Sequence, residues 1–426
     1  MNEETKKRIA AINSGIIPEG YKKTKVGIVP VEWEDTHFSE LFIEKKNVTS
    51  DFEKYPLYSL TIEEGVVPKS ERYERSHLVK KDDIFKIVSE NDFVYNPMNV
   101  RFGALARYKG QEDVSVSGYY DIFSVKESVS KEYMENFLLS EPMINYYNRV
   151  STGSLKEKQR VHFSQFLDFV LPIPPLPEQQ KIAEILSMQD KLIELQEKKI
   201  EQLKELKKAY LQKMFPKKGS KYPELRFKGF TDPWEQRELG DLADIIGGGT
   251  PSTSNDDYWD GDIDWYAPAE IADQIYVSSS ERKITQQGYE NCSAKMLPVG
   301  TVLFTSRAGI GKTAILRKEG CTNQGFQSIV PHKNMLDSYF IFSRTEELKR
   351  YGETKGAGST FVEVSGKQMA SMELMMPKTI EEQKAIGSYF QNLDHLITLH
   401  QRKSEQEKQK KKALMQLLLT GKVRCK

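Results

Sequence analysis

The chain has 426 residues, of which 38% are hydrophobic and 29% charged, and its formal net charge is +1. This length favours two to four domains, the composition is that of a soluble protein, and its three scattered cysteines fit a reducing cytoplasm. The sequence excludes a membrane-spanning helix, because no run of about 18 apolar residues occurs, and a disulfide framework, because Cys292, Cys321 and Cys425 are scattered along the chain.

The first part of the chain is predicted to be a short helix and linker at 1–24, followed by a globular segment at 25–172. Trp33 lies near the start of this segment, and the proline-rich stretch Leu-Pro-Ile-Pro-Pro-Leu-Pro177 begins at its end. Such prolines are typical of a position just before a helix begins. Residues 131–140 are predicted to form a helix. Runs rich in β-branched and aromatic residues predict strands at 58–62, 84–88, 93–95 and 120–125.

Residues 173–215 are predicted to form a long central helix, because they are rich in Glu, Lys, Leu, Gln and Ala. At about 1.5 Å per residue, its repeated part at 177–215 would be roughly 57 Å long, which favours a coiled-coil pair. Gln189 and Gln196 interrupt its apolar seam, and polar residues there lower stability but can fix the register. The alternative is a solvated charged helix that only spaces two domains. The seam residues are Ile182, Leu186, Ile193, Ile200 and Leu203.

A linker and a second globular segment are predicted at 216–378, and a second long helix with a tail at 379–426. The second globular segment begins at Trp234, as the first begins at Trp33. Residues 336–350 are predicted to form its helix. Its predicted strands lie at 265–266, 301–304, 313–316 and 328–330.

The two long helices are copies of each other, related by a constant offset of 204 positions without a gap. Glu178 and Gln179 correspond in this way to Glu382 and Gln383. An ungapped internal repeat of this length predicts that one architecture occurs twice in the chain. The middle of the second copy, 401–412, is entirely polar and departs from a hydrophobic seam. Its residues expected to pair with the central helix are Ile386, Phe390, Ile397 and Leu414.

Several patterns resemble catalytic signatures but lack an essential residue. The stretch 306–313 resembles a phosphate-binding loop, but that loop requires glycine where Ser306 stands, so Gly309 and Gly311 are interpreted as a tight turn. Asn96-Pro-Met98 lacks the second proline and the aromatic residue of an amino-methyltransferase motif. The six histidines show no ligand spacing. We therefore expect no catalytic residue, no metal and no cofactor.

Basic and amide side chains in the loops of both globular segments are candidates for contact with DNA. Such side chains supply the phosphate and base-edge contacts of DNA-binding proteins. Taken singly, each is more often a solvated surface residue, so the hypothesis depends on their recurrence in two corresponding segments. The candidates are Lys69, Arg72, Asn99, Arg101, Arg107, Lys283, Arg307, Lys312 and Gln324.

Over essentially its whole length, the chain resembles the specificity subunit of type I restriction–modification systems. The resemblance is carried by the two Glu-Gln-x-x-Ile helix starts, by Asp190 and Asp394 after them, and by the proline-rich stretch before the first. The segment starts at Trp33 and Trp234 and the stretch Gly-Gly-Gly-Thr-Pro251 also match the family. No single motif is decisive, but their order and duplication are specific.

The resemblance implies an α+β fold with two mixed α/β target-recognition domains, joined and separated by two long antiparallel coiled-coil helices in a pseudo-twofold internal repeat. It also implies the partners: double-stranded DNA with a split target sequence, two methyltransferase subunits held by the helices, and restriction or translocase subunits. The family's subunit has no catalysis of its own, which agrees with the incomplete motifs.

Two other classes of protein remain open at this point. A cytoplasmic scaffold would join partner proteins through its helices and never touch DNA. A fused restriction enzyme would carry its own catalytic domain, which the length and the incomplete motifs oppose. Salt-dependent DNA binding in the presence of a methyltransferase partner would distinguish a specificity subunit from such a scaffold.

Overall fold

The computed structural model describes residues 2–69, 84–153, 159–272, 274–307, 309–357 and 363–425. Its internal contacts divide the chain into two units. The first unit comprises residues 1–196 with 403–426, and the second unit comprises 197–402. Each unit therefore contains one globular segment together with one half of each long helix.

The first unit is built on an antiparallel four-stranded sheet in the order β10-β9-β12-β4, beside a three-stranded sheet in the order β11-β8-β5. The pairs β1-β2, β3-β13 and β6-β7 complete its strands. Its elements are α1 (Glu3–Asn13), β1 (Tyr21–Thr24), β2 (Gly27–Pro30), β3 (Glu34–His37), α2 (Phe38–Leu41), β4 (Phe42–Lys45), β5 (Val48–Thr49), β6 (Tyr58–Thr61), β7 (Gly65–Pro68), β8 (Phe85–Val88), β9 (Phe93–Tyr95), η3 (Val100–Phe102), β10 (Leu105–Arg107), β11 (Val114–Ser117), β12 (Asp121–Val125), α3 (Lys131–Leu138), α4 (Glu141–Val150), α5 (Phe163–Leu167) and β13 (Val170–Ile173).

The second unit repeats this plan. Its five-stranded sheet has the order β15-β22-β19-β20-β17, in which the first four strands follow the chain connectivity of β4, β12, β9 and β10. The pair β14-β23 corresponds to β3-β13, and a further sheet has the order β18-β16-β21. The elements are β14 (Glu235–Glu238), α7 (Leu239–Leu242), β15 (Ala243–Gly247), η5 (Asp256–Tyr258), β16 (Trp259–Tyr266), η6 (Pro268–Glu270), β17 (Tyr276–Val277), β18 (Arg282–Ile284), α8 (Gln286–Glu290), β19 (Val302–Phe304), β20 (Thr313–Leu316), β21 (Cys321–Thr322), β22 (Gln327–Pro331), α9 (Ser338–Ser343), α10 (Thr345–Gly356), α11 (Gly366–Ala370) and β23 (Glu373–Met376).

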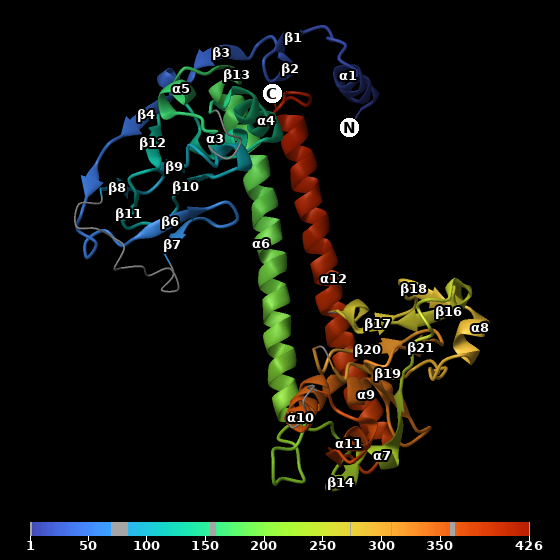
Figure 1. Ribbon diagram of the computed structural model, residues 1–426. Helices are drawn as coiled ribbons and strands as arrows, with labels where there is room; N and C mark the ends of the chain where they lie inside the picture. Colours follow the sequence, from blue (N-terminus) through green and yellow to red (C-terminus); the bar gives the residue numbers. More distant parts are fainter. Residues whose placement is uncertain are drawn as a thin grey trace. The chain divides into compact units, whose positions relative to one another are not determined.

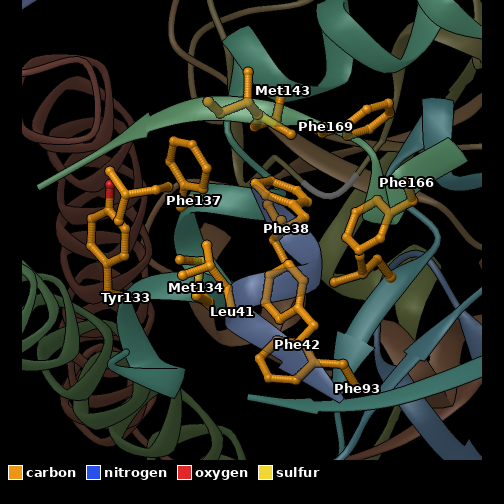
Figure 2. Close-up of a cluster of buried hydrophobic side chains, with 14 of the residues drawn as sticks. Phe38, Leu41, Phe42, Phe93, Tyr133, Met134, Phe137, Met143, Phe166 and Phe169 are labelled. Atoms are coloured by element: carbon orange, nitrogen blue, oxygen red, sulfur yellow. The ribbon is translucent and has the colours of Figure 1, made fainter. Parts of the chain in front are cut away.

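Aromatic side chains dominate the core of the first unit (Figure 2). The Phe38 ring packs edge-on against Phe166, with centroids 5.0 Å apart, and Phe93 stacks on Phe123 at 5.2 Å. Edge-to-face and offset contacts of this kind add to the stabilisation from burying each ring. The core of the second unit is mainly aliphatic, with Trp234 and Phe340 among its buried rings.

The two predicted long helices form as α6 (Leu176–Lys213) and α12 (Ile380–Leu418), each a continuous helix (Figure 1). In the first unit the start of α6 packs with the end of α12, and in the second unit the end of α6 packs with the start of α12. The halves in each unit therefore run in opposite directions. Of the predicted seam residues, Ile182, Leu186 and Leu414 pack in the first core, Ile200, Leu203, Ile386, Phe390 and Ile397 pack in the second, and Ile193 is partly buried.

The same ion pair recurs in both helix pairings. Lys411 Nζ lies 2.6 Å from Asp190 Oδ1 in the first unit, and Lys207 Nζ lies 2.7 Å from Asp394 Oδ1 in the second. Both aspartates and both lysines are related by the offset of 204 positions. The internal repeat of the sequence thus extends to contacts between side chains.

The interiors of the two pairings differ. In the first unit, buried Gln189 donates a hydrogen bond to the side chain of Glu407. The offset places Leu393 and Leu203 at the corresponding positions of the second unit, where both are buried in its core. One pairing therefore contains a polar layer where the other is aliphatic.

Candidate nucleic-acid interface and helix joints

The start of α6 is joined to the first unit through a buried carboxylate. Trp33 Nε1 donates to Glu178 Oε2 at 3.1 Å, and the Arg424 guanidinium donates to both carboxylate oxygens at 2.8 and 2.9 Å. Burial alone would raise the pKa of Glu178, but hydrogen bonds from Arg424, the Cys425 amide and Trp33 outweigh it and hold this pKa below its ordinary value. The carboxylate therefore stays charged where α6 begins.

The start of α12 has the same joint in the second unit. Trp234 Nε1 donates to Glu382 Oε1 at 3.3 Å, and the Arg226 guanidinium donates to both oxygens at 2.7 and 2.8 Å. Glu382 is buried, and its hydrogen bonds raise the pKa of Arg226 further. The arginine comes from the segment after α6 here, whereas in the first unit it comes from the end of the chain.

The glutamine after each of these glutamates caps a helix of the adjoining unit. Gln179 Oε1 accepts from the amide of Ser130, the N-cap residue of α3, at 3.0 Å. Gln383 Oε1 accepts from the amide of Asp337, the N-cap residue of α9, at 3.1 Å. The Glu-Gln pairs thus join the start of each long helix to the adjoining unit through hydrogen bonds. The sequence repeat marked these positions but did not identify their partners.

A corresponding turn follows the same strand in both units. It lies between β9 and β10 in the first unit and between β19 and β20 in the second. Val161 donates its amide to Pro97 O at 2.9 Å, and Val364 donates its amide to Ser306 O at 3.0 Å. The framework of the turn is therefore repeated, although its residues differ.

In the second unit this turn brings predicted DNA-binding residues together. Gly309 and Gly311 have φ angles of +104° and +95°, which glycine tolerates, and the chain reverses tightly into β20. The interpretation of Gly309 and Gly311 as a tight turn is confirmed. The Ser306 amide donates to Gly325 O at 2.8 Å, which places half-buried Arg307 beside the loop of exposed Gln324. Lys312, on the same turn, is also exposed.

A glycine-rich loop after β15 adds a third side to this polar cluster. A Cβ on Gly248 would lie 2.0 Å from Asn323 O, so this loop requires glycine to pack backbone against backbone. Thr250 donates a hydrogen bond to Gln324. The indole N–H groups of Trp265 and Trp259 hold the loop through Gly249 O at 2.8 Å and Ser252 O at 3.1 Å. Arg307, Gln324 and Thr250 thus form one polar cluster, hereafter the loop cluster, from three loops.

Lys283 lies in a different environment from the loop cluster. It forms an ion pair with the buried carboxylate of Asp264 at 3.6 Å, and Lys318 pairs with the same group at 2.7 Å. Burial would raise the pKa of Asp264, but Lys318, the Ser280 amide and Lys283 together lower it. Lys283 neutralises an internal charge, which favours a structural role beside any contact with DNA.

The candidates in the first unit are spread over several environments. Asn99 is exposed on the corresponding turn, and Lys69 is exposed just after β7. Arg101 is buried, donates to Gln159 at 3.3 Å and lies over the exposed Phe102 ring at 4.3 Å. Arg107 is occupied by Glu135 at 2.8 Å and by Glu132 and Asn91. Arg72 lies outside the described residues.

The described residues contain no group of three or more His, Cys, Asp or Glu side chains placed to hold a metal ion. In the same part of the chain, no helix is both long and apolar enough to cross a membrane. Burial raises the pKa of the Cys321 thiol to about 12, so this cysteine is a poor nucleophile.

The fold defines the class of protein: two globular parts that differ in their loops are carried on one repeated helical framework. The model of the type I restriction modification DNA specificity domain matches the chain twice, at residues 30–205 and 231–409. The chain therefore belongs to the type I restriction modification DNA specificity family and carries two copies of its domain, which confirms the resemblance stated from the sequence.

Curated relatives agree with this assignment. The chain is 38% identical over 165 residues to the MjaIX specificity subunit of Methanocaldococcus jannaschii, and this match spans 38% of each chain. It is 27% identical to the putative MjaX specificity subunit of the same organism over 96% of this chain and 97% of the relative.

Solved structures support the fold. One solved structure concerns the structural basis of complex assembly and conformational transition of the type I R-M system. A chain of that structure superposes on this chain with a TM-score of 0.57 at 17% sequence identity. The superposition covers 93% of this chain and 99% of that one. At this identity the similarity concerns the fold alone.

Proposed function

We propose that each unit recognises one half of a bipartite DNA sequence, and that the paired helices set the distance between the halves and hold the modification subunits. In this proposal the first reader is the globular part of the first unit, 25–172, and the second reader is that of the second unit, 216–378. The chain itself catalyses nothing, and it acts in the cytoplasm.

The observation that carries the proposal is the contrast between repeated joints and divergent loops. Glu178 and Glu382 have equivalent partners, whereas the turn at Asn99 shares almost no residues with the turn at Arg307. A protein that reads two different half-sites needs identical supports and different reading surfaces. A scaffold that only joins proteins has no such need in its loops.

The loop cluster is the strongest candidate for base contact in the second reader. Its hydroxyl, amide and guanidinium groups match the donors and acceptors on base edges. Replacing Arg307 by alanine is expected to weaken binding by about 1–3 kcal/mol and to relax one position of the second half-site. Lys69, Lys312 and Asn99 are proposed as accessory contacts, and Lys312→Ala is expected to reduce the salt dependence of binding without changing the target.

The experiment that tests the readers is an exchange of 25–172 for the matching segment of another family member. We expect one half of the methylated sequence to change and the other half to persist, because the second reader is untouched. The methylated motif is read by modified-base sequencing of host DNA. If both halves changed, or neither, each unit could not be an independent reader.

An exposed apolar stripe on the helices supports a role in holding modification subunits. Met188, Leu192 and Leu195 are 55%, 44% and 54% exposed in the first unit, and Leu396 and Leu399 are 41% and 38% exposed in the second. The offset of 204 relates Leu192 to Leu396 and Leu195 to Leu399. Two equivalent stripes suit two copies of one methyltransferase subunit, with restriction subunits joining the same assembly.

To test the role of the stripe, Leu192 and Leu195 are replaced by glutamine in one variant, and Leu396 and Leu399 are replaced by glutamine in another. Each pair is expected to remove one methyltransferase subunit from the complex, as measured by native mass spectrometry. Glu194→Gln, also on an exposed face of α6, is the control that should leave the assembly intact. Full assembly of both leucine variants would contradict the proposed docking stripe.

The ruler role is tested by lengthening both helices equally. Four residues are inserted after Lys198 and four after Arg402, two positions related by the repeat, so that each unit keeps its own helix contacts. Each helix gains about 6 Å, and DNA rises about 3.4 Å per base pair. The spacer between half-sites should therefore grow by about one to two base pairs while both half-sites persist. Unaltered spacing would leave the helices as partner-binding surfaces only.

A further inference from the structure

The helix pairing of the first unit contains a polar layer that the repeat does not copy. Gln189 is 4% exposed, and its Nε2 donates both to the carboxylate of Glu407 and to Glu407 O, the latter at 3.2 Å. Ser404, also buried, lies one turn away on α12. The corresponding positions of the second unit hold Leu393, Leu203 and Ile200.

Because α6 and α12 are repeats, each resembles the partner that the other needs. If α6 of one chain met α6 of a second copy in the same antiparallel register, Asp190 would still face a lysine, that of position 207. The ion pairs therefore do not distinguish the helices of one chain from those of another copy. A chain with two interchangeable helices would exchange them and form dimers.

The polar layer removes this interchangeability. In an α6–α6 pair, Gln189 would face the leucine of position 203, so a buried amide would lose its acceptor. In an α12–α12 pair, the partly exposed Glu407 carboxylate, which also pairs with Lys410 at 3.4 Å, would face the leucine of position 393 and lose the Gln189 amide. A polar group that loses its partner on burial is strongly unfavourable, whereas the Gln–Glu and Leu–Leu combinations of the native pairing are both matched.

We propose that Gln189 and Glu407, together with Leu203 and Leu393, form a pairing code that makes α6 select α12 and reject the α6 of a second copy. The code concerns assembly and does not depend on DNA binding. Its consequence, that the two different readers are held by one α6–α12 pair and the target keeps two different halves, rests on the proposed function.

The pairing preference can be reversed in the full-length chain by exchanging one leucine and one glutamate, which leaves the amino-acid composition unchanged. The double variant Leu203→Glu/Glu407→Leu gives α6 both polar partners and α12 two leucines. Pairing within one chain is then mismatched in both units, while α6–α6 and α12–α12 pairs are matched. We expect the dimer-to-monomer ratio to rise at least about tenfold, equivalent to about 1.4 kcal/mol, as measured by light scattering after chromatography and by native mass spectrometry.

The matched control moves the whole layer into the second unit. Adding Gln189→Leu and Leu393→Gln to the double variant restores matched pairing within one chain, so the quadruple variant should return to the monomer. Circular dichroism should show wild-type helix content for all three proteins. A dimeric quadruple variant, or a folded double variant that remains monomeric, would overturn the proposal.

If the double variant does not fold, the proposal is tested by measuring the energetic coupling between Gln189 and Glu407 in the otherwise wild-type chain. Gln189→Leu, Glu407→Leu and the combination of both are compared by denaturant unfolding. We expect each single change to raise the unfolding equilibrium constant more than the combination does, with a coupling of at least about tenfold, because only the combination removes both polar groups. Additive effects of the two changes would show that the layer carries no pairing preference and would overturn the proposal.

Discussion

The joints at Glu178 and Glu382 occupy the same place in two units, yet they are assembled from different parts of the chain. Each buried carboxylate receives a tryptophan N–H and a bidentate arginine. Arg424 comes from the last residues of the chain, whereas Arg226 comes from the segment after α6. The difference shows that the repeat is preserved in space rather than in chain order, because a buried carboxylate requires a cation whatever its connection.

The largest effect is expected from removing either arginine. Arg226→Ala leaves Glu382 buried without its cation and should destabilise the second unit by about 3–5 kcal/mol. Arg424→Ala should do the same in the first unit. Hydrogen exchange resolved by segment measures which unit loses protection.

A surface ion pair in the second unit serves as the control. Arg237 pairs with Asp241 at 3.8 Å, and both side chains are more than one third exposed. Arg237→Ala should therefore change stability by no more than about 0.5 kcal/mol. Equal loss of protection in both units after Arg226→Ala would show that the joints are not local to their units.

A second prediction uses the glycine that interrupts the repeat. A Cβ on Gly387 would lie 2.5 Å from Asp337 Oδ1 and 3.0 Å from the Phe340 amide, the two groups that cap α9. Gly387→Ala should therefore cost about 1–3 kcal/mol by overpacking, despite its better helix propensity. Thermal unfolding followed by circular dichroism measures the loss.

The matched change in the first unit is Ala183→Gly, since Ala183 occupies the corresponding position of α6. It creates no clash and should cost about 1 kcal/mol, mainly through helix propensity. A stabilising effect of Gly387→Ala would contradict the short distance between α12 and the residues that cap α9.

The repeated ion pairs should differ in strength because their burial differs. The side chain of Asp394 is 9% exposed and also accepts from Tyr339 at 2.8 Å, whereas that of Asp190 is 51% exposed. Asp394→Asn should cost about 1–3 kcal/mol, because it weakens two buried interactions. Asp190→Asn should cost about 0.2–1 kcal/mol. Denaturant unfolding of both variants tests this ranking, and equal losses would contradict it.

The smallest effect is a pH dependence confined to the second unit. A hydrogen bond to the Asp244 carboxylate, 3.1 Å from His332 Nε2, raises the pKa of His332 above its usual 6.5. The added stability is fully present below the unfolded pKa and is lost as pH rises through the folded value. Because the pair is largely exposed, the loss should be under about 1 kcal/mol. Unfolding free energies near pH 6 and pH 8.5 for wild type and His332→Gln measure it, and identical pH slopes would contradict it.

Local sequence patterns were sufficient to predict the two long helices. The long helices predicted within 173–215 and 379–426 form as α6 and α12, because composition, helix propensity and apolar periodicity act over neighbouring residues. The turn at Gly309 and Gly311 was predictable for the same reason. The predicted helix at 336–350 is instead divided into α9 and α10.

Charged residues could not be sorted in this way. Arg107, Arg307 and Lys312 look equivalent in the sequence, but carboxylates of the same unit occupy Arg107, while Lys312 is exposed. Arg424 had no visible role until the fold brought it to Glu178, 246 positions away. A charge becomes a support or a contact surface according to which groups long-range packing brings within reach.

The duplication, the two long helices and the family of the chain could all be predicted without the structure, because they depend on local periodicity and on a gapless repeat. Only the tertiary structure decided which glutamate meets which arginine, which loops converge on Gln324, and where Gln189 finds its acceptor. Hydrogen bonds and ion pairs between distant segments depend on distances of a few ångström, and those distances arise only when both cores have packed.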